Sequence, residues 1–130
     1  MVIDPIGDML NRIKTAGLSQ RSSIIVSFSD VKMRIGNILA REGYVAGVAK
    51  KTRKGLPVLE VTLAYVGKEP KVKDSLRISK PSRRIYSSHD KLGAYHRNLG
   101  VLLLSTPKGI MTHVEARKEH VGGEILLRVW

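Results

Sequence analysis

The sequence predicts an α+β protein with two lobes. The N-terminal α/β lobe has the order helix, strand, helix, strand, strand, and the C-terminal lobe is mainly β with one short helix. Three observations support this: apolar residues recur at helical spacing near the N-terminus, β-branched runs of strand length follow, and the polar run GKEPK interrupts the pattern. We therefore expect lobes at residues 1–66 and 72–130, joined by a linker at residues 67–71.

The first element is a helix that begins at Asp4-Pro5 and ends near Gly17. Aspartate accepts hydrogen bonds from the free N–H groups at a helix start, proline suits the first helical position, and glycine commonly follows a helix end. The helix has one apolar face, so it should pack against the rest of its lobe. That face consists of Ile6, Met9, Leu10 and Ile13.

A strand is expected at residues 24–28, where the chain is apolar and β-branched. Ser29 or Asp30 then caps a second helix with its own apolar face. The lobe ends with two strands, residues 44–49 and 58–66, and the basic sequence KKTRKG forms the hairpin loop between them.

The C-terminal lobe should be mainly β, because short apolar runs alternate with polar turn residues. It contains one well-marked helix: Thr112 followed by Glu115 is a capping-box pattern, and the helix should run to about His120. A further helical turn is expected within residues 88–98. The expected strands are residues 72–79, 84–87, 101–105 and 124–130.

The composition indicates which functions to expect. The chain has 130 residues, 42% of them hydrophobic, and a net charge of +12, so it can form a core and should bind nucleic acid or an acidic surface. The absence of cysteine excludes disulfides and thiolate metal sites. No apolar run is long enough to cross a membrane and the N-terminus is unlike a secretory signal, so we expect a cytosolic or organelle-matrix protein. We also expect no cofactor.

Two basic clusters are candidates for phosphate contacts. One is KKTRKG at residues 50–55, and the other is SKPSRRIY at residues 79–86, where Lys80 and Arg84 precede Tyr86. Dense cations neutralise phosphates and release counterions. Tyr86 has two open interpretations, because a tyrosine beside guanidinium groups can stack an unpaired base but is also a common half-buried strand residue.

The loop STPKG at residues 105–109 and the sequence GGE at residues 122–124 form a second candidate site. Ser105 and Thr106 carry short hydroxyls that donate and accept, which suits base edges and ribose 2′-OH groups. The same residue types are common in turns, so a strand-to-turn connection explains them as well. Glu124 is unusual on a basic surface: it accepts hydrogen bonds from base amino groups or 2′-OH groups, orients Ser105, or pairs with a nearby cation.

Catalysis is the weakest alternative. Ser105, His113 and Glu115 lie close in sequence, but the serine has no G-x-S-x-G context, and a triad depends on three-dimensional geometry. The chain has neither a P-loop nor an H-E-x-x-H motif, and His113 and His120 are too far apart on one helix to share a metal easily. We therefore predict a binding protein without a metal or a small-molecule substrate.

Three motifs together resemble one known family along the whole chain. They are DPIGDMLNRIK near the N-terminus, SKPSRRIY in the middle, and STPKGIMTHVEAR followed by GGEIL near the C-terminus. In order and spacing they are similar to the universal small-subunit ribosomal protein number eight (uS-eight) family. The form of STPKG and GGEIL resembles bacterial members, and an organelle of bacterial descent fits as well.

The resemblance implies a two-lobed, non-enzymatic constituent of the cytoplasmic small ribosomal subunit that binds the central domain of 16S-type rRNA directly and helps to assemble the platform. Other implied partners are neighbouring small-subunit ribosomal proteins and, in several bacteria, its own operon messenger, whose translation it represses. Matching positions imply an RNA-binding set. In the C-terminal lobe it is Ser105, Thr106, Lys108, Gly109, Tyr86, Arg84, Lys80, Gly122, Gly123 and Glu124, and in the N-terminal lobe it is Asn11, Arg12, Lys14, Thr15, Ser29 and Lys32.

The sequence departs from the family pattern at several positions. Lys80 stands where arginine is usual, Ser82 where glycine is usual, and Pro107 where serine is common, which removes one hydroxyl and one N–H donor. Asn11 and Thr15 replace a common threonine and asparagine. The main alternative to a specific rRNA-binding protein is a general binder of double-stranded RNA or DNA, which would show little preference between a regular duplex and a bulged helix.

Overall fold

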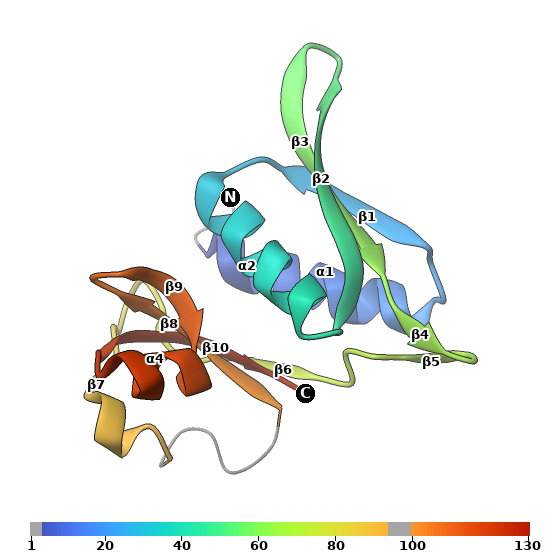
Figure 1. The fold of residues 1–130 in the computed structure, drawn as a ribbon. Coiled ribbons are helices and arrows are strands. Elements are labelled where there is room, and N and C mark those ends of the chain that lie inside the picture. The colour runs from blue at the N-terminus through green and yellow to red at the C-terminus, as the bar shows by residue number, and fades with distance from the viewer. Residues whose placement is uncertain (1–3, 94–99) are drawn as a thin grey trace. The chain divides into compact units, whose positions relative to one another are not determined.

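The computed structural model describes residues 4–93 and 100–130. These form two compact units, one of Pro5–Lys73 and one of Asp4 with Asp74–Trp130. The first contains two α-helices and a small sheet, and the described residues of the second are mainly β with one short α-helix, so the predicted α+β class is confirmed (Figure 1). Within the described residues, no helix combines the length and the apolar character needed to cross a membrane.

The two helices of the first unit begin where the sequence predicts. α1 (Pro5–Leu18) and α2 (Asp30–Arg41) each bury one apolar face. The N-cap of α2 is Ser29, whose hydroxyl accepts a hydrogen bond from the Lys32 N–H at 3.2 Å. The buried apolar residues are Met9, Leu10, Ile13 and Ala16 in α1, and Ile35, Ile38 and Leu39 in α2.

The sheet of this unit is antiparallel, with the order β1 (Ser23–Ser27), β3 (Leu56–Leu63), β2 (Val45–Arg53). Along β3, Leu59 and Val61 are fully buried while their neighbours are less so, because successive side chains of a strand point to opposite faces. The apolar face meets the helices, and Figure 1 shows α1 and α2 lying along this sheet.

The basic hairpin differs from the prediction. Residues 50–53, predicted as loop, belong to β2, and only Lys54 and Gly55 form the turn, with φ values of 52° and 79°. Pairing continues to Arg53 and Leu56, since an antiparallel ribbon that faces water accommodates charged side chains. Figure 1 shows this hairpin extending past the end of β1.

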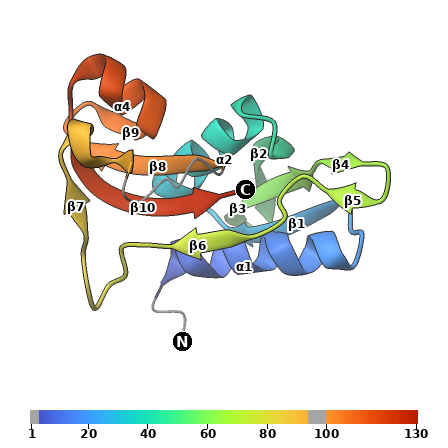
Figure 2. The same ribbon diagram turned by 90° about the horizontal axis from the view of Figure 1, so that it is seen from below.

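A second, smaller hairpin was not predicted. β4 (Tyr65–Val66) pairs with β5 (Glu69–Pro70), so residues 67–71, predicted as a linker, contain a turn and a short strand. The hairpin lies beside the end of α1 (Figure 2), where a Cβ on Gly17 would come within 3.0 Å of the Pro70 Cβ. The predicted lobe limits on either side of this segment stay a prediction.

The second unit is built on an antiparallel sheet with the order β6, β10, β8, β9, and β7 also pairs with β10. β10 is therefore the strand on which β6, β7 and β8 all pair. The strands are β6 (Ser75–Arg77), β7 (Tyr86–Ser87), β8 (Val101–Thr106), β9 (Gly109–Thr112) and β10 (Gly123–Val129).

Several strands of this unit differ in length from the prediction. β6 and β7 are shorter than the predicted ranges 72–79 and 84–87, although the N–H groups of Ile78 and Ser79 still donate to β10 carbonyls at 3.1 Å. β9 was missed, because its apolar run is very short and lies between a turn and a helix cap.

The predicted helix of this unit is confirmed. α4 (His113–Glu119) begins with the capping box: the Thr112 hydroxyl accepts from the Glu115 N–H, and the Thr112 N–H donates to the Glu115 carboxylate, both at 3.2 Å. It ends at His120, which adopts the left-handed conformation. One face of the sheet packs beneath it, in a buried cluster of Leu92, Leu102, Leu104, Met111, Ala116 and Ile125.

In the described part of this range, a 3₁₀ turn at His89–Lys91 corresponds to the helical turn predicted within residues 88–98. Residues 94–99 of that range lie outside the described residues.

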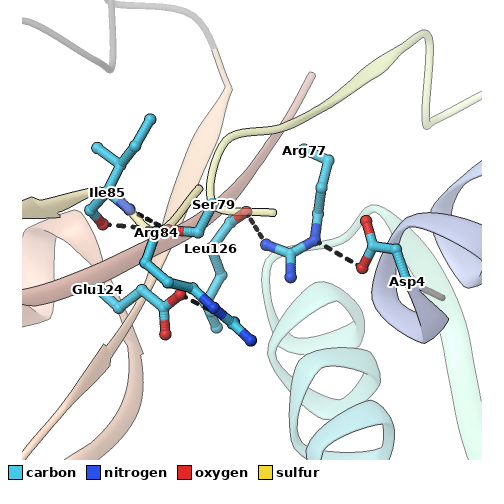
Figure 3. A network of polar contacts seen from close by, with 7 residues as sticks. All are labelled: Asp4, Arg77, Ser79, Arg84, Ile85, Glu124 and Leu126. Atoms are coloured by element: carbon cyan, nitrogen blue, oxygen red, sulfur yellow. Dashed lines mark hydrogen bonds and ion pairs between the residues drawn. The ribbon is translucent and has the colours of Figure 1, made fainter. Parts of the chain in front are cut away.

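Ser79 closes the basic loop between β6 and β7 (Figure 3). This side chain is fully buried, and its hydroxyl accepts from the Ile85 N–H at 2.8 Å and donates to the Ile85 carbonyl at 3.1 Å. Within the loop, the backbones of Lys80 and Arg83 exchange two hydrogen bonds of 2.9 Å. The loop SKPSRR is therefore a compact turn that projects its cations from a fixed base.

Arg77 joins the start of this unit to its sheet (Figure 3). Its Nε donates to the Asp4 carboxylate at 3.2 Å, and its Nη1 donates to the Leu126 carbonyl at 2.6 Å. The sequence predicts Asp4 as a helix cap, and the structure shows its carboxylate as an ion-pair partner of β6.

We predict that Ser79→Ala destabilises the protein by about 1–3 kcal/mol, because the partly buried Ile85 N–H loses its acceptor. Ser82→Ala in the same loop is the matched control, since Ser82 is exposed and its loss should change stability by less than about 0.5 kcal/mol. Urea unfolding measures both. Equal stability of the two variants would show that the Ser79 hydroxyl does not hold the loop.

Candidate nucleic-acid interface

Three of the predicted RNA-binding residues lie in one row across neighbouring strands. Tyr86 of β7 pairs with Glu124 of β10, and Glu124 pairs with Ser105 of β8. Ser105 in turn pairs with Ile110 of β9, which extends the row. Directly paired residues of antiparallel strands project from the same face, so these four side chains share one surface. We call Tyr86, Glu124, Ser105 and Ile110 the β10 row.

The β10 row lies on the face of the sheet opposite α4. The adjacent row, Ile125 with Leu104 and Met111, belongs to the buried cluster under α4, and successive residues of a strand point to opposite faces. Tyr86 is 66% exposed, whereas Ile85 beside it packs against the buried cluster. The exposed ring favours the stacking interpretation of Tyr86 over the half-buried strand tyrosine.

Glu124 has a cationic partner. Arg84 Nη1 donates to the Glu124 carboxylate at 3.2 Å (Figure 3), with side-chain exposures of 50% for Arg84 and 17% for Glu124. The carboxylate holds the guanidinium beside the row, and both groups retain further hydrogen-bonding capacity. Such a pair can offer donors to phosphate and acceptors to base amino groups from one place.

Gly122 and Gly123 have a steric reason to be glycine. A Cβ on Gly122 would lie 2.3 Å from the Ser87 carbonyl oxygen, and a Cβ on Gly123 would lie 2.0 Å from that of Ser105. These contacts involve backbone atoms, which cannot move aside without disturbing the strands. The two glycines therefore position the β10 row by letting β10 fit between β7 and β8.

The turn between β8 and β9 uses the hydroxyl of Thr106. This residue is 8% exposed, and its Oγ1 donates to the Gly109 carbonyl at 2.8 Å and accepts from the Lys108 N–H at 3.1 Å. Gly109 has a φ of 115°, which a side chain would strain. Thr106 and Gly109 therefore shape the turn, while the Lys108 side chain reaches outward and pairs with exposed Glu119 at 3.0 Å.

Asp90, in the 3₁₀ turn that follows β7, has a hydrogen-bonded carboxylate. The Ser88 hydroxyl donates to the Asp90 carboxylate at 2.6 Å, and this bond is the main reason that the pKa of Asp90 is lowered from its ordinary value. A backbone hydrogen bond at Asp90 acts in the same direction.

The predicted residues of the first unit fall into two groups. Asn11, Arg12 and Thr15 are exposed on α1, and Lys14 is partly buried. This surface of α1 can meet phosphates and sugars.

Ser29 and Lys32 are instead engaged within the fold. Ser29 caps α2, and Lys32 is only 6% exposed, with its Nζ donating to the Ser27 carbonyl at 3.1 Å and to the Ser27 hydroxyl at 3.0 Å. Lys32 therefore ties the first turn of α2 to the end of β1. Its Nζ is thus engaged by Ser27, and a contact of Lys32 with RNA stays a prediction.

The residues considered for catalysis have structural roles. His113 is buried, and its Nδ1 accepts from the Leu102 N–H at 3.3 Å. Glu115 forms the capping box with Thr112, and Ser105 lies in the β10 row. The three groups therefore serve the helix cap, the core and the sheet.

Residue patterns alone missed Ser79 and Ile110, and they named Arg84 without identifying Glu124 as its partner. Ser79 lies six residues before its partner Ile85, and a serine at that distance from an apolar residue is too common a pattern to be specific. Ile110 needed the unpredicted β9, and the partnership of Arg84 with Glu124 needed the register of β7 on β10.

Known proteins resemble this chain over nearly its full length. The sequence profile of the family described as "Ribosomal protein S8" matches residues 4–130. "Small ribosomal subunit protein uS8" of Pelagibacter ubique is 42% identical over 127 residues, which cover 98% of this chain and 97% of that protein. The proteins of the same name from Gluconobacter oxydans and Caulobacter vibrioides are 42% and 41% identical over 128 residues, with the same coverage.

We predict that Thr106→Val lowers the free energy of unfolding by about 1–3 kcal/mol, because the turn loses an acceptor for the Lys108 N–H and a donor to Gly109. Thr106→Ser keeps the hydroxyl and should retain most of the stability. Thermal and urea unfolding measure the difference. If Thr106→Val unfolded like the native protein and yet bound RNA poorly, the hydroxyl would act at the RNA and not in the turn.

Proposed function

Since the chain belongs to the ribosomal protein S8 family, we propose that it is a structural component of the bacterial small ribosomal subunit and that its C-terminal unit binds 16S-type rRNA directly. The family consists of structural ribosomal proteins, and the chain is not an enzyme. We place it on the cytoplasmic ribosome, with rRNA and neighbouring ribosomal proteins as its partners.

The observation that carries this proposal is the β10 row with its ion pair. An exposed aromatic ring, a carboxylate and a hydroxyl lie side by side on three paired strands, and Arg84 is held next to them. A regular A-form duplex offers mainly phosphates and 2′-OH groups, whereas bulged bases can stack on a ring and use their edges for hydrogen bonds. The row therefore suits an irregular RNA helix better than a uniform duplex.

The cations and the row would contribute differently. Lys80, Arg83 and Lys108 are exposed around the row, and such cations supply salt-dependent affinity without reading sequence. Tyr86, Glu124 and Ser105 would supply the preference for one RNA shape. A general duplex binder would need only the first contribution.

We propose further that the RNA site is in the central domain, that binding helps to assemble the platform, and that a messenger of its own operon with a similar fold competes for the same surface. These proposals rest on the resemblance of SKPSRRIY, STPKG and GGEIL to the family motifs. They are supported by the fact that these motifs supply β7, the β8–β9 turn and β10, which meet at the row.

Tyr86→Ala tests stacking. Loss of a base–aromatic stack should weaken binding to a bulged central-domain RNA fragment by about 1–3 kcal/mol, while the melting temperature barely changes because the ring is exposed. Tyr86→Phe keeps the ring and should bind nearly as well as the native protein. A large loss of stability in Tyr86→Ala, with no specific loss of RNA affinity, would make the ring a packing residue.

Glu124→Gln tests whether the row reads RNA shape. General electrostatics says that removal of a negative charge strengthens binding to any polyanion. If the carboxylate accepts hydrogen bonds from the irregular helix, its removal should instead weaken that binding by about 1.5–3 kcal/mol, or roughly 10- to 150-fold. Binding to a regular duplex of equal length, at matched salt, should become slightly tighter.

The ion pair between Glu124 and Arg84 means that the Glu124→Gln experiment needs a second set of variants. Glu124→Gln also releases Arg84, so both changes should be measured alone and together in a double-mutant cycle. A direct contact from Glu124 to RNA predicts that Glu124→Gln still weakens binding in the Arg84→Gln background. Tighter binding of Glu124→Gln to both RNAs would reduce Glu124 to a background charge and remove the row as the specificity site.

A further inference from the structure

The first unit contains an open depression that the motifs do not explain. It has a volume of about 600 Å³ and lies between α1, the edge strand β1 and the end of β2. Of its lining, only Arg12 and Thr15 belong to the set implied by the family resemblance. The lining residues are Arg12, Thr15, Ala16, Ser19, Arg21, Ser23, Ile24, Ile25 and Arg53.

The charged side chains that line this depression are all positive. Three guanidinium groups, Arg12, Arg21 and Arg53, come from three different segments, and none of the residues that line the depression in the described part of the chain is acidic. A neighbouring carboxylate on β3, Glu60, pairs with Ile25 across the strands and forms an ion pair with Lys51 at 2.8 Å. The depression is therefore a concentrated cationic surface.

The remaining lining suits a chain of sugars and phosphates. Thr15, Ser19 and Ser23 offer hydroxyls that can bond phosphate oxygens or 2′-OH groups, and the apolar side chains between them can contact sugar faces. A single small anion would need a tighter enclosure than this open surface. Guanidinium groups on separate segments match a ligand whose charges are spread along its length.

The backbone around Arg21 is fixed, which prepares the side chain for binding. The Arg21 N–H donates to the Ala16 carbonyl at 3.0 Å, and the Arg21 carbonyl accepts from the Tyr65 hydroxyl at 2.5 Å. Arg53 lies in a paired strand position opposite Leu56. Arg12 lies within α1, so all three cations are attached to ordered backbone, and binding needs little ordering of the chain.

We propose that this depression, the arginine groove, holds a stretch of RNA sugar–phosphate backbone, with Arg21 and Arg53 as phosphate-binding residues alongside Arg12. The inference rests on the proposed function, because the RNA is the same small-subunit rRNA. The groove binds backbone without reading bases, and it is a separate contact from the β10 row.

The first experiment measures the salt dependence of binding to refolded full-length 16S-type rRNA. Each phosphate contact contributes about one unit to the slope of log K against log salt, so the double variant Arg21→Gln/Arg53→Gln should make the slope shallower by about two. The control Arg34→Gln/Lys68→Gln removes the same charge from exposed positions outside the groove and should leave the slope nearly unchanged. Equal effects of the two double variants would overturn the proposal.

A crosslinking experiment identifies what occupies the groove. A photoreactive benzoylphenylalanine placed at exposed Ser19 should crosslink to rRNA in assembled small subunits. Crosslinks only to another ribosomal protein would mean that an acidic protein segment occupies the groove. Crosslinks to neither would mean that the groove is open, and both results contradict the proposal.

The experiments can contradict the proposal for the arginine groove and the proposal for the β10 row independently. If the Tyr86 and Glu124 variants bind rRNA normally while the Arg21/Arg53 variant has the shallow slope, the proposed specificity site is wrong and the groove stands. If the row variants weaken binding and the groove variant keeps the native slope, the groove alone is wrong. Two independent contacts predict that the free-energy losses of Tyr86→Ala and the groove variant add when combined.

Discussion

The C-terminal unit depends on the close backbone approach at Gly122 and Gly123. At these positions β10 fits between β7 and β8 with no room for a Cβ, since either added carbon would lie within 2.3 Å of a carbonyl oxygen. Because the strands meet this closely, Tyr86, Glu124 and Ser105 become lateral neighbours. The double glycine is thus a condition for the proposed RNA-binding surface, and it needs no contact with RNA to be essential.

Around these glycines, the residues that hold the loops in place differ from the exposed residues that are available to a ligand. The hydroxyls of Ser79 and Thr106 form hydrogen bonds within the loops that flank the row. In the first unit, Lys32 has a similar structural role because it ties α2 to β1. The exposed groups, such as Tyr86 and Arg84, are left to meet a ligand. Short polar side chains close the turns here, and exposed rings and guanidinium groups extend beyond them, so the residues that build the shape differ from those that would read it.

Local signals in the sequence predicted local structure well. The Thr112–Glu115 capping box and the Ser29 cap depend on residues three positions apart, and both are present in the structure. What the sequence could not supply was pairing between distant segments. The missed strand β9 is stabilised by β8, the predicted linker gains order by packing on α1, and the burial of Lys32 depends on where Ser27 lies. The candidate residues were named from motifs, but their arrangement in a row follows from strand register, which no single motif contains.

Backbone chemical-shift mapping of the isotope-labelled protein with a bulged central-domain rRNA fragment tests the central claim most directly. Amides of residues 84–86, 105, 106, 108, 109 and 122–124 should shift together and saturably on addition of the fragment, whereas a regular duplex at the same salt should cause much smaller shifts there. Shifts of equal size with both RNAs, or shifts that avoid the β10 row, would contradict the claim that this row recognises an irregular RNA helix.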